Sequence, residues 1–170
     1  MKWIALFSQT GSELQNICES LDRMPDVVYT NNMIDVIMYK GDVQRMRHQD
    51  IEHELKQFSE KDVLITLHGY LRVLSPDVCN MDAVILNGHP APVHLYPELK
   101  GKDMQIPQYT HKAKYDTIGT IIHKVITELD SGEIIAYNES PNNLKSVDDA
   151  FSTLKIMSKE LWIEVLSKYL

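Results

Sequence analysis

The chain has 170 residues, of which 44% are hydrophobic, enough for one well-filled core and too few to make two ordinary domains. Its 24 acidic residues outnumber its 17 basic ones, which gives a formal net charge of −7. Binding nucleic acid through its phosphates requires clustered Lys and Arg, so this balance argues against a nucleic-acid partner. We therefore expect a single domain that binds a small molecule.

The sequence shows no signal for export and no membrane segment. Met1 to Phe7 contains one Lys and a short apolar run, without the longer apolar core and small-residue cleavage site of a signal peptide. No later apolar stretch approaches the roughly 18 residues that a membrane span requires. Cys18 and Cys79 lack CxxC spacing, which favours reduced thiols. We predict a soluble, cytoplasmic protein.

Apolar runs alternate with helix-periodic segments through the first half of the chain. The run Trp3–Phe7 predicts a strand, and apolar residues at positions 14, 17 and 21 predict a helix after a polar turn. Val43–Phe58 has a few apolar residues among many charges, as a surface helix does. Asp26–Tyr29 and Ile34–Tyr39 are short and rich in β-branched and aromatic residues, so we predict a strand at each.

The alternation continues in the second half. Val63–Leu67 and Ala83–Leu86 are typical of strands buried on both faces, separated by a turn or helix start at Ser75-Pro76. Prolines at positions 90, 92 and 97 prevent regular structure, so we predict a long ordered loop from residue 88 to residue 101. The remaining predictions are a helix within Lys102–Asp116, strands at Ile118–Thr127 and Glu133–Tyr137, and one or two helices over Val147–Leu170.

This pattern predicts an α/β fold with a Rossmann-like, doubly wound, mostly parallel sheet in a single domain. Ligands of such sheets bind outside the carboxyl ends of the strands, near the point where the strand order reverses. The polar loops after Phe7, Leu67 and Leu86 are therefore the predicted positions of a site.

Three polar residues are candidates for catalysis. Asn87 and His89 directly follow the strand Ala83–Leu86. An Asn side chain can donate to a developing oxyanion, and an imidazole exchanges a proton near neutral pH. Asp130, in the connection between the last two predicted strands, could orient the His89 ring and stabilise its charged form. A His after a strand is more often structural than catalytic, so the residues alone leave both interpretations open.

Several segments of the chain contain motifs that occur together in one known protein family. Val84–Pro90 is similar to the family's apolar strand with Asn-x-His-Pro, and Tyr96–Gly101 is similar to its Tyr-Pro-Gly-Leu-Lys-Gly element. Further similar segments are the glycine-bearing turn Ser8–Ser12, Gly69–Pro76, Gly119–His123 and Glu128–Ile135. They follow in the right order over nearly the whole chain, and their joint occurrence is more specific than any one of them. The chain therefore resembles the folate-dependent formyltransferase family, nearest to its phosphoribosylglycinamide formyltransferases.

The resemblance implies that residues 1–170 form a catalytic domain that transfers the formyl group of 10-formyltetrahydrofolate to a primary amine without a metal ion. It implies that Asn87 and His89 face the formyl group and that Asp130 completes the catalytic set. The pterin pocket would be formed, largely through backbone groups, by Leu71, Arg72, Val73, Leu74, Asn87, Ile126, Thr127, Glu128, Leu129 and Asp130. Gly11 and Ser12, together with Glu13, would contact the acceptor, for which glycinamide ribonucleotide of purine biosynthesis is the first expectation.

Glu13 departs from the family pattern, which commonly has Asn at that position. A carboxylate beside a phosphate is unfavourable unless a cation or a turned-away side chain offsets it. If Gly11 and Ser12 hold a phosphate, Glu13→Asn should tighten acceptor binding; if the acceptor presents an amine or hydroxyl there, the same change should weaken it. Formylation of an amino sugar or another small amine therefore stays open, as do hydrolysis of 10-formyltetrahydrofolate and folate binding without catalysis.

The other histidines show no spacing that indicates a metal site. His123 lies inside a predicted strand, and we interpret it as a core histidine or one that supports the catalytic residues. His89 and His94 are five residues apart in a proline-rich loop without helical register, which does not favour zinc. We interpret five histidines as surface or loop residues: His48, His53, His68, His94 and His111.

Overall fold

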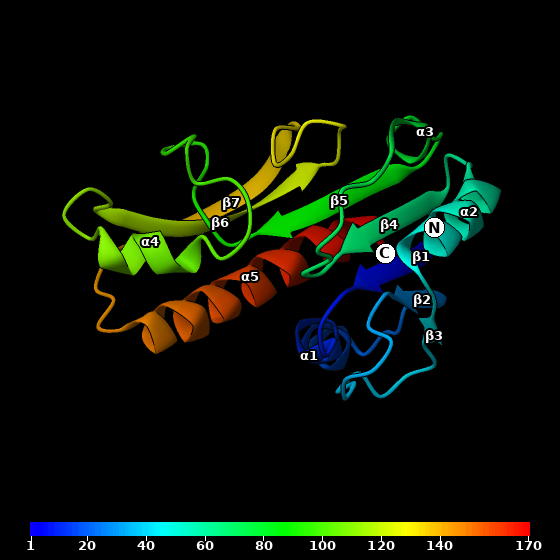
Figure 1. Ribbon diagram of the computed structural model, residues 1–170, viewed down its shortest axis with the longest axis horizontal. Coiled ribbons are helices and arrows are strands. Elements are labelled where there is room, and N and C mark those ends of the chain that lie inside the picture. The colour runs from blue at the N-terminus through cyan, green and yellow to red at the C-terminus, as the bar shows by residue number, and fades with distance from the viewer.

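The computed structural model describes all residues from 1 to 170 and contains one seven-stranded sheet (Figure 1). The strand order is β3-β2-β1-β4-β5-β6-β7. The first five strands of this order are parallel, and β6 and β7 are added antiparallel. The strands are β1 (Lys2–Phe7), β2 (Val27–Thr30), β3 (Gln44–Arg45), β4 (Val63–Leu67), β5 (Val84–His89), β6 (Thr117–Lys124) and β7 (Ile134–Pro141). The predicted α/β fold with a mostly parallel sheet is confirmed.

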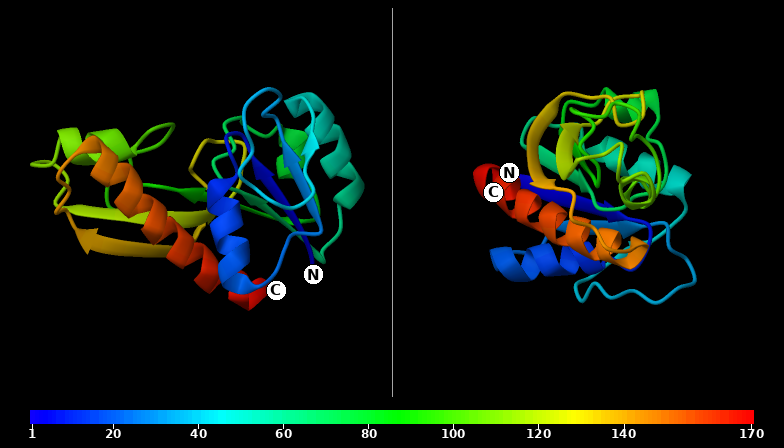
Figure 2. Two further views of the ribbon diagram at one scale, coloured as in Figure 1. Left: turned by 90° about the horizontal axis from the view of Figure 1, so that it is seen from below. Right: turned by 90° about the vertical axis from the view of Figure 1, so that its left-hand side faces the viewer.

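Helices cover both faces of the sheet (Figure 2). One face packs against α1 (Ser12–Leu21) and the long α5 (Val147–Tyr169), and Trp3, Phe7 and Trp162 are among the fully buried residues of this core. The other face packs against α2 (His48–Leu55) and the short α3 (Pro76–Cys79). The remaining elements are the 3₁₀ helix η1 (Lys56–Phe58) and α4 (Gln105–Thr110). No helix combines the length and the apolar character needed to cross a membrane.

The central strands are apolar on both faces because both faces are covered. All five residues of β4 are buried, as are Trp3 to Phe7 in β1. Such continuous apolar runs are what parallel sheets between two helical layers require. The register pairs Leu6 of β1 with Leu67 of β4, so these two strands end together. Their carboxyl ends form the edge of the sheet at which a ligand is expected.

The predicted strand Ile34–Tyr39 is wrong, since the segment is a loop. The Asn32 side chain accepts hydrogen bonds from the backbone of Ile34 and Asp35, and Arg45 donates to the carbonyl oxygens of Asn32 and Asp35. These local bonds occupy the backbone groups that a strand would pair, which is how Asn disfavours regular structure. The next strand of the sheet is instead the two-residue β3.

Strand β5 continues further than predicted, because its two neighbours end at different places. Parallel pairing with β4 stops where Leu67 meets Asn87, whereas antiparallel pairing with β6 continues to His89. Asn87 and His89 therefore lie on the strand and not in the loop after it. Since side chains alternate along a strand, the two point to the same side.

A single helix, α5, occupies the region where one or two were predicted. The side chain of Ser146 caps it by accepting a hydrogen bond from the backbone of Asp149. Its Trp162 packs so closely against β5 that a Cβ atom on Gly88 would lie 2.5 Å from the indole nitrogen. Glycine at position 88 is what allows the helix to approach the strand between the two candidate catalytic residues.

Candidate active site

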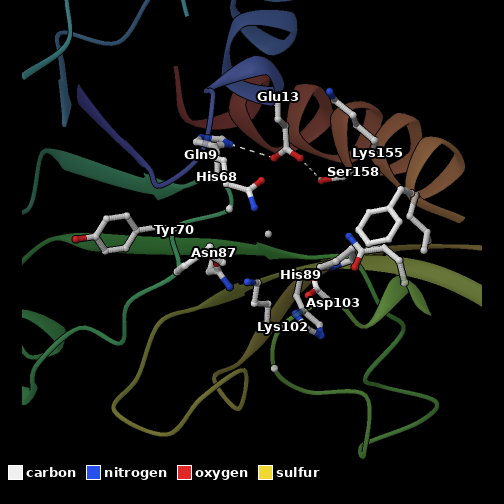
Figure 3. Close-up of a pocket in the computed structure, with 18 of the residues that line it drawn as sticks. Gln9, Glu13, His68, Tyr70, Asn87, His89, Lys102, Asp103, Lys155 and Ser158 are labelled. Atoms are coloured by element: carbon white, nitrogen blue, oxygen red, sulfur yellow. Dashed lines mark hydrogen bonds and ion pairs between the residues drawn. The ribbon is translucent and has the colours of Figure 1, made fainter. Parts of the chain in front are cut away.

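A cavity of about 630 Å³ opens at the carboxyl ends of β1, β4 and β5. Its walls come from the turn after β1, the loop after β4, the end of β5 and the middle of α5 (Figure 3). These include the three loops that the sequence pattern indicated. Charged residues of both signs line the cavity: Glu13, Arg72, Lys102, Asp103, Asp130 and Lys155.

The structure brings Asn87, His89 and Asp130 together at the wall of this cavity. Asp130 is only 8% exposed, and φ of 49° places it in the left-handed region, which Asp tolerates better than most residues. Its Oδ2 accepts a hydrogen bond of 2.8 Å from the backbone of Gly101. Its loop lies so close to the end of β6 that a Cβ atom on Gly132 would be 1.7 Å from the Lys124 carbonyl oxygen.

The His89 ring is almost fully buried, and both of its nitrogens face acceptors. Nε2 is 2.6 Å from the carbonyl oxygen of Leu99, and Nδ1 is 3.5 Å from Oδ2 of Asp130. Burial lowers the pKa of His89 below its ordinary value, and the Asp130 carboxylate and the Leu99 carbonyl offset only part of that effect. The resting ring is therefore mostly neutral, while its protonated form would have a partner on each nitrogen.

His123 links Asn87 to Asp130. Its Nδ1 donates to the Lys124 carbonyl oxygen at 2.9 Å, so in the neutral ring Nε2 is an acceptor. The Asn87 amide nitrogen is 3.1 Å from this Nε2 and 3.4 Å from Oδ1 of Asp130. Burial raises the pKa of Asp130, but His123, which can donate through Nε2 only when its ring is protonated, together with His89 and the Gly101 backbone, outweighs burial and leaves that pKa below its ordinary value.

Most of the residues expected to form the pterin pocket surround a smaller hollow of about 50 Å³ beside the main cavity. The two hollows share Arg72, Val73, Asn87, Leu129 and Asp130 among their lining residues. The rim carries exposed apolar side chains: Leu71, Val73, Ile126 and Leu129. Leu74 also lines the smaller hollow, whereas Thr127 and Glu128 line neither.

Glu13 lies across the cavity from Asn87 and His89 (Figure 3), and Gly11 and Ser12, which precede it at the start of α1, also line the cavity. Gly11 is the N-cap of the helix, with φ of 74°. The Lys155 ammonium lies 2.9 Å from the Ser12 hydroxyl, and the Glu13 carboxylate is turned to Ser158 and His68. A nearby cation, one of the two conditions under which Glu13 tolerates a bound anion, is thus present, whereas the Glu13 carboxylate itself still lines the cavity.

The interpretation of His48 as a surface or loop residue is wrong, because His48 is a buried residue of α2, whereas His68 lies in the loop after β4 but is also buried. His48 contacts the Tyr70 hydroxyl at 2.7 Å, and His68 lies between Glu13 and Thr66. Sequence reasoning also missed Lys155 and Ser158, which lie on α5 far along the chain from the turn that they contact. Only their spacing of three, which places them on one face of a helix, could have suggested that they act together.

Residues 30–149 match the family model described as formyl transferase. The chain belongs to this family. It is accordingly a formyltransferase, an enzyme of a family that uses formyl-tetrahydrofolate as co-substrate. A search among curated proteins gave no match. No group of three or more His, Cys, Asp or Glu side chains is arranged to hold a metal ion.

Solved structures of formyltransferases share the fold. Phosphoribosylglycinamide formyltransferase from Campylobacter jejuni is 22% identical with a TM-score of 0.80, and the match covers 99% of this chain and 96% of that one. The Streptococcus pneumoniae enzyme of the same name is 23% identical with a TM-score of 0.78, covering 99% and 98%. A sugar N-formyltransferase from a Shewanella species is 16% identical with a TM-score of 0.73, covering 99% of this chain and 70% of that one.

Proposed function

We propose that this formyltransferase domain, residues 1–170, transfers the formyl group of 10-formyltetrahydrofolate to a primary amine, with glycinamide ribonucleotide as the leading acceptor. The observation that carries the proposal is the meeting of Asn87, His89 and Asp130 at one wall of the main cavity. A neutral acceptor amine would attack the formyl carbon, and the formyl oxygen would become negative in the tetrahedral intermediate. The C–N bond to the folate would then break.

Asn87 is placed to stabilise the developing oxyanion. One of its amide hydrogens is held by His123, whereas the 3.4 Å contact to Asp130 is long for an N–H···O bond. The hydrogen facing Asp130 can therefore be redirected to the formyl oxygen at little cost. His89, when protonated between Leu99 and Asp130, adds positive charge on the same side of β5.

Asp130 can assist the proton transfer that the reaction requires. The attacking amine loses one proton as the new C–N bond matures, and the departing folate nitrogen gains one. A water molecule held by the Asp130 carboxylate can relay that proton, so no net acid or base is consumed. His123 is a positioning residue here, because it fixes the orientation of the Asn87 amide and contacts Asp130.

The hollow beside the catalytic wall suits a reduced folate. Its floor holds Leu67, Leu74 and Val125, and its rim carries exposed apolar side chains that a flat ring would cover. Because both hollows share Asn87 and Asp130, a ring lying where the smaller hollow opens into the main cavity would place its attached formyl group near these two residues.

The acceptor half of the cavity favours an anionic amine. Lys155 and the first backbone N–H groups of α1 lie beside Ser12, and two further cations, Arg72 and Lys102, line the same space. A phosphate group would be attracted there. An amino sugar is the alternative acceptor, supported by the departure at Glu13 and by the fold shared with a sugar N-formyltransferase.

The direct test is to incubate the protein with 10-formyltetrahydrofolate and a panel of amines, and to identify the formylated product by mass spectrometry. We expect transfer to glycinamide ribonucleotide. Transfer to an amino sugar alone would replace the acceptor, and formate release without any amine would indicate hydrolysis. Folate binding with neither product would contradict the proposed function.

A further inference from the structure

Two polar contacts join the start of α1 to the middle of α5 at the acceptor end of the cavity. Lys155 contacts the Ser12 hydroxyl at 2.9 Å, and the Ser158 hydroxyl donates to Glu13 at 3.3 Å. Because residues 155 and 158 are one helical turn apart, they lie on the same face of α5. The cavity wall therefore presents a cation and a carboxylate side by side (Figure 3).

A chain of buried hydrogen bonds orients the His68 ring toward the Glu13 carboxylate. The Trp3 indole donates to the Thr66 hydroxyl at 2.8 Å, and that hydroxyl is 2.8 Å from Nε2 of His68. Thr66 has no other acceptor among its contacts, so its proton goes to Nε2, and His68 carries its own proton on Nδ1. Nδ1 faces Oε1 of Glu13 at 3.4 Å.

The pair of His68 and Glu13 is rigid on one side and open on the other. The His68 side chain is completely buried and stacks against Trp162 with ring centroids 4.5 Å apart, whereas Glu13 keeps 25% of its side chain exposed to the cavity. Each carboxylate oxygen receives one protein donor, from His68 or Ser158, and retains lone pairs for a ligand. Glu13 is thus an acceptor in the cavity wall, directed by two long contacts to the protein.

The neighbouring ammonium decides which kind of ligand donor fits. A cationic ligand group at Glu13 would also face Lys155, which repels it, while an anionic group would be drawn to Lys155 and pushed away from Glu13. A neutral donor avoids both conflicts. Two adjacent hydroxyls of a sugar can each donate to one oxygen of a carboxylate, while an anionic group on the same molecule reaches the ammonium.

We propose that Glu13 recognises adjacent sugar hydroxyls of the acceptor, and that Lys155 with Ser12 recognises an anionic group on that same sugar. This inference rests on the proposed function, because it assumes that the acceptor occupies this cavity. Glu13 is then a specificity-determining residue whose role depends on His68 and Ser158. A substitution of Glu13 could either strengthen or weaken acceptor binding, and this geometry supports weaker binding.

The test measures binding by calorimetry without any folate. The probes are ribose 5-phosphate and its analogue lacking the 2- and 3-hydroxyls. The wild type should bind the first at least about tenfold more tightly, since hydrogen bonds to a charged group are strong. Glu13→Gln should remove this difference by weakening only the hydroxylated probe, whereas Lys155→Ala should weaken both probes equally. Glu19→Gln, the same change elsewhere on α1, should alter neither.

An unchanged preference in Glu13→Gln would overturn the inference. So would tighter binding of both probes, which would mean that Glu13 only repels the anion, or no binding of either probe to the wild type. The formylation assay with the amine panel tests the proposed function separately. Formylation without hydroxyl discrimination would refute only this inference, and discrimination without formylation of any amine would refute only the proposed function.

Discussion

Asp130 is a carboxylate between two imidazoles in a nearly closed environment. Its oxygens lie 3.5 Å from Nδ1 of His89 and 3.5 Å from Nε2 of His123. Removing water from a charge costs several kcal/mol unless donors replace it, and the backbone N–H of Gly101 is one such donor. The group is therefore held ionised between the two imidazoles.

We predict that Asp130→Asn reduces turnover by about 10²- to 10⁴-fold, the range for loss of a positioned acid–base group. Asparagine keeps the size of the side chain and tolerates the left-handed backbone, so the fold should be retained. The carboxamide cannot stabilise a protonated His89 or order a proton-relaying water as a carboxylate does. Steady-state kinetics with the best amine of the panel, together with the circular dichroism spectrum, measures both effects.

Asp103→Asn is the matched control for that variant. Asp103 also lines the main cavity and also has a positive φ, 60°, but no hydrogen bond or ion pair joins its side chain to His89, Asn87 or Asp130. Its substitution should leave turnover within a few-fold of the wild type. Equal losses in the two variants would mean that cavity charge in general matters and not the position of Asp130.

The sequence could place Asn87 and His89 at the end of a strand, but not the groups around them. The contacts of Asp130 with His89 and His123 depend on how the loop after β6 folds back, and the nearness of Gly132 to Lys124 has no sequence signature. The pairing of Glu13 with His68 was missed for the same reason. Fifty-five positions separate the two residues, and their contact depends on β1 and β4 ending side by side.

At the scale of elements, helix α2 holds the loop that follows β4. Glu52 accepts a hydrogen bond of 2.6 Å from the backbone of Ser75, and His48 joins the Tyr70 hydroxyl to the Glu52 carboxylate. Burial lowers the pKa of His48, Glu52 partly offsets this, and nearby Arg72 lowers it further. The same loop provides Leu71 to Leu74, part of the expected folate site.

We predict that stability falls as the pH drops below about 6.5, the ordinary pKa of a histidine. His48 and His89 both have folded-state pKa values below that value, so in acid the unfolded chain binds protons that the folded one does not. Urea unfolding at a series of pH values measures the slope. His48→Gln, which cannot titrate, should flatten it; an unchanged slope would exclude His48 as a contributor.

A second element-scale prediction concerns the contact between β5 and α5. Gly88→Ala should destabilise the protein by about 1 to 3 kcal/mol, as overpacking does, because its Cβ would overlap the Trp162 indole. The displaced strand should also lower turnover, since Asn87 and His89 flank position 88. Denaturant unfolding and kinetics measure the two losses.

A double-mutant cycle provides the control for Gly88→Ala. Trp162→Phe removes the ring that carries the indole nitrogen, so Gly88→Ala should cost less stability in that background than in the wild type. Additive losses would show that the glycine matters for another reason, such as backbone freedom.

Strands were predicted correctly where burial determines the hydrophobic pattern of the sequence. The prediction was wrong where local hydrogen bonds determine the structure. Strands β1 and β4 are apolar on both faces, which a continuous hydrophobic run reports directly. Ile34–Tyr39 has the composition of a strand, but Ile34 and Val36 are 90% and 77% exposed. The side chains of Asn32 and Arg45 hold this loop, and composition alone cannot reveal that arrangement.

At the scale of the whole molecule, the order β3-β2-β1-β4-β5 reverses direction between β1 and β4. The cavity lies at that reversal, where doubly wound sheets bind their ligands. The chain ends lie near each other (Figure 1), and Arg23 donates to the carbonyl oxygens of both Met1 and Leu170. The antiparallel β6 and β7 extend the sheet past the reversal. His123 lies on β6 and Asp130 in the connection to β7, so the proposed catalytic wall joins the parallel part of the sheet to the antiparallel part.

Thermal melting can distinguish a folate from a dinucleotide as the ligand of this cavity. The comparison is needed because dinucleotides bind at the same reversal of strand order in related sheets. The turn Ser8–Ser12 contains a single glycine and not the three that a dinucleotide pyrophosphate requires. The hollow beside β5 instead has an apolar rim suited to a pterin ring. A reduced folate at 100 times its dissociation constant should add about 2.7 kcal/mol, roughly 5 to 11 °C in melting temperature, and NAD should add nothing. Thermal melting with each ligand decides between them, and a shift with NAD but none with the folate would refute the folate site.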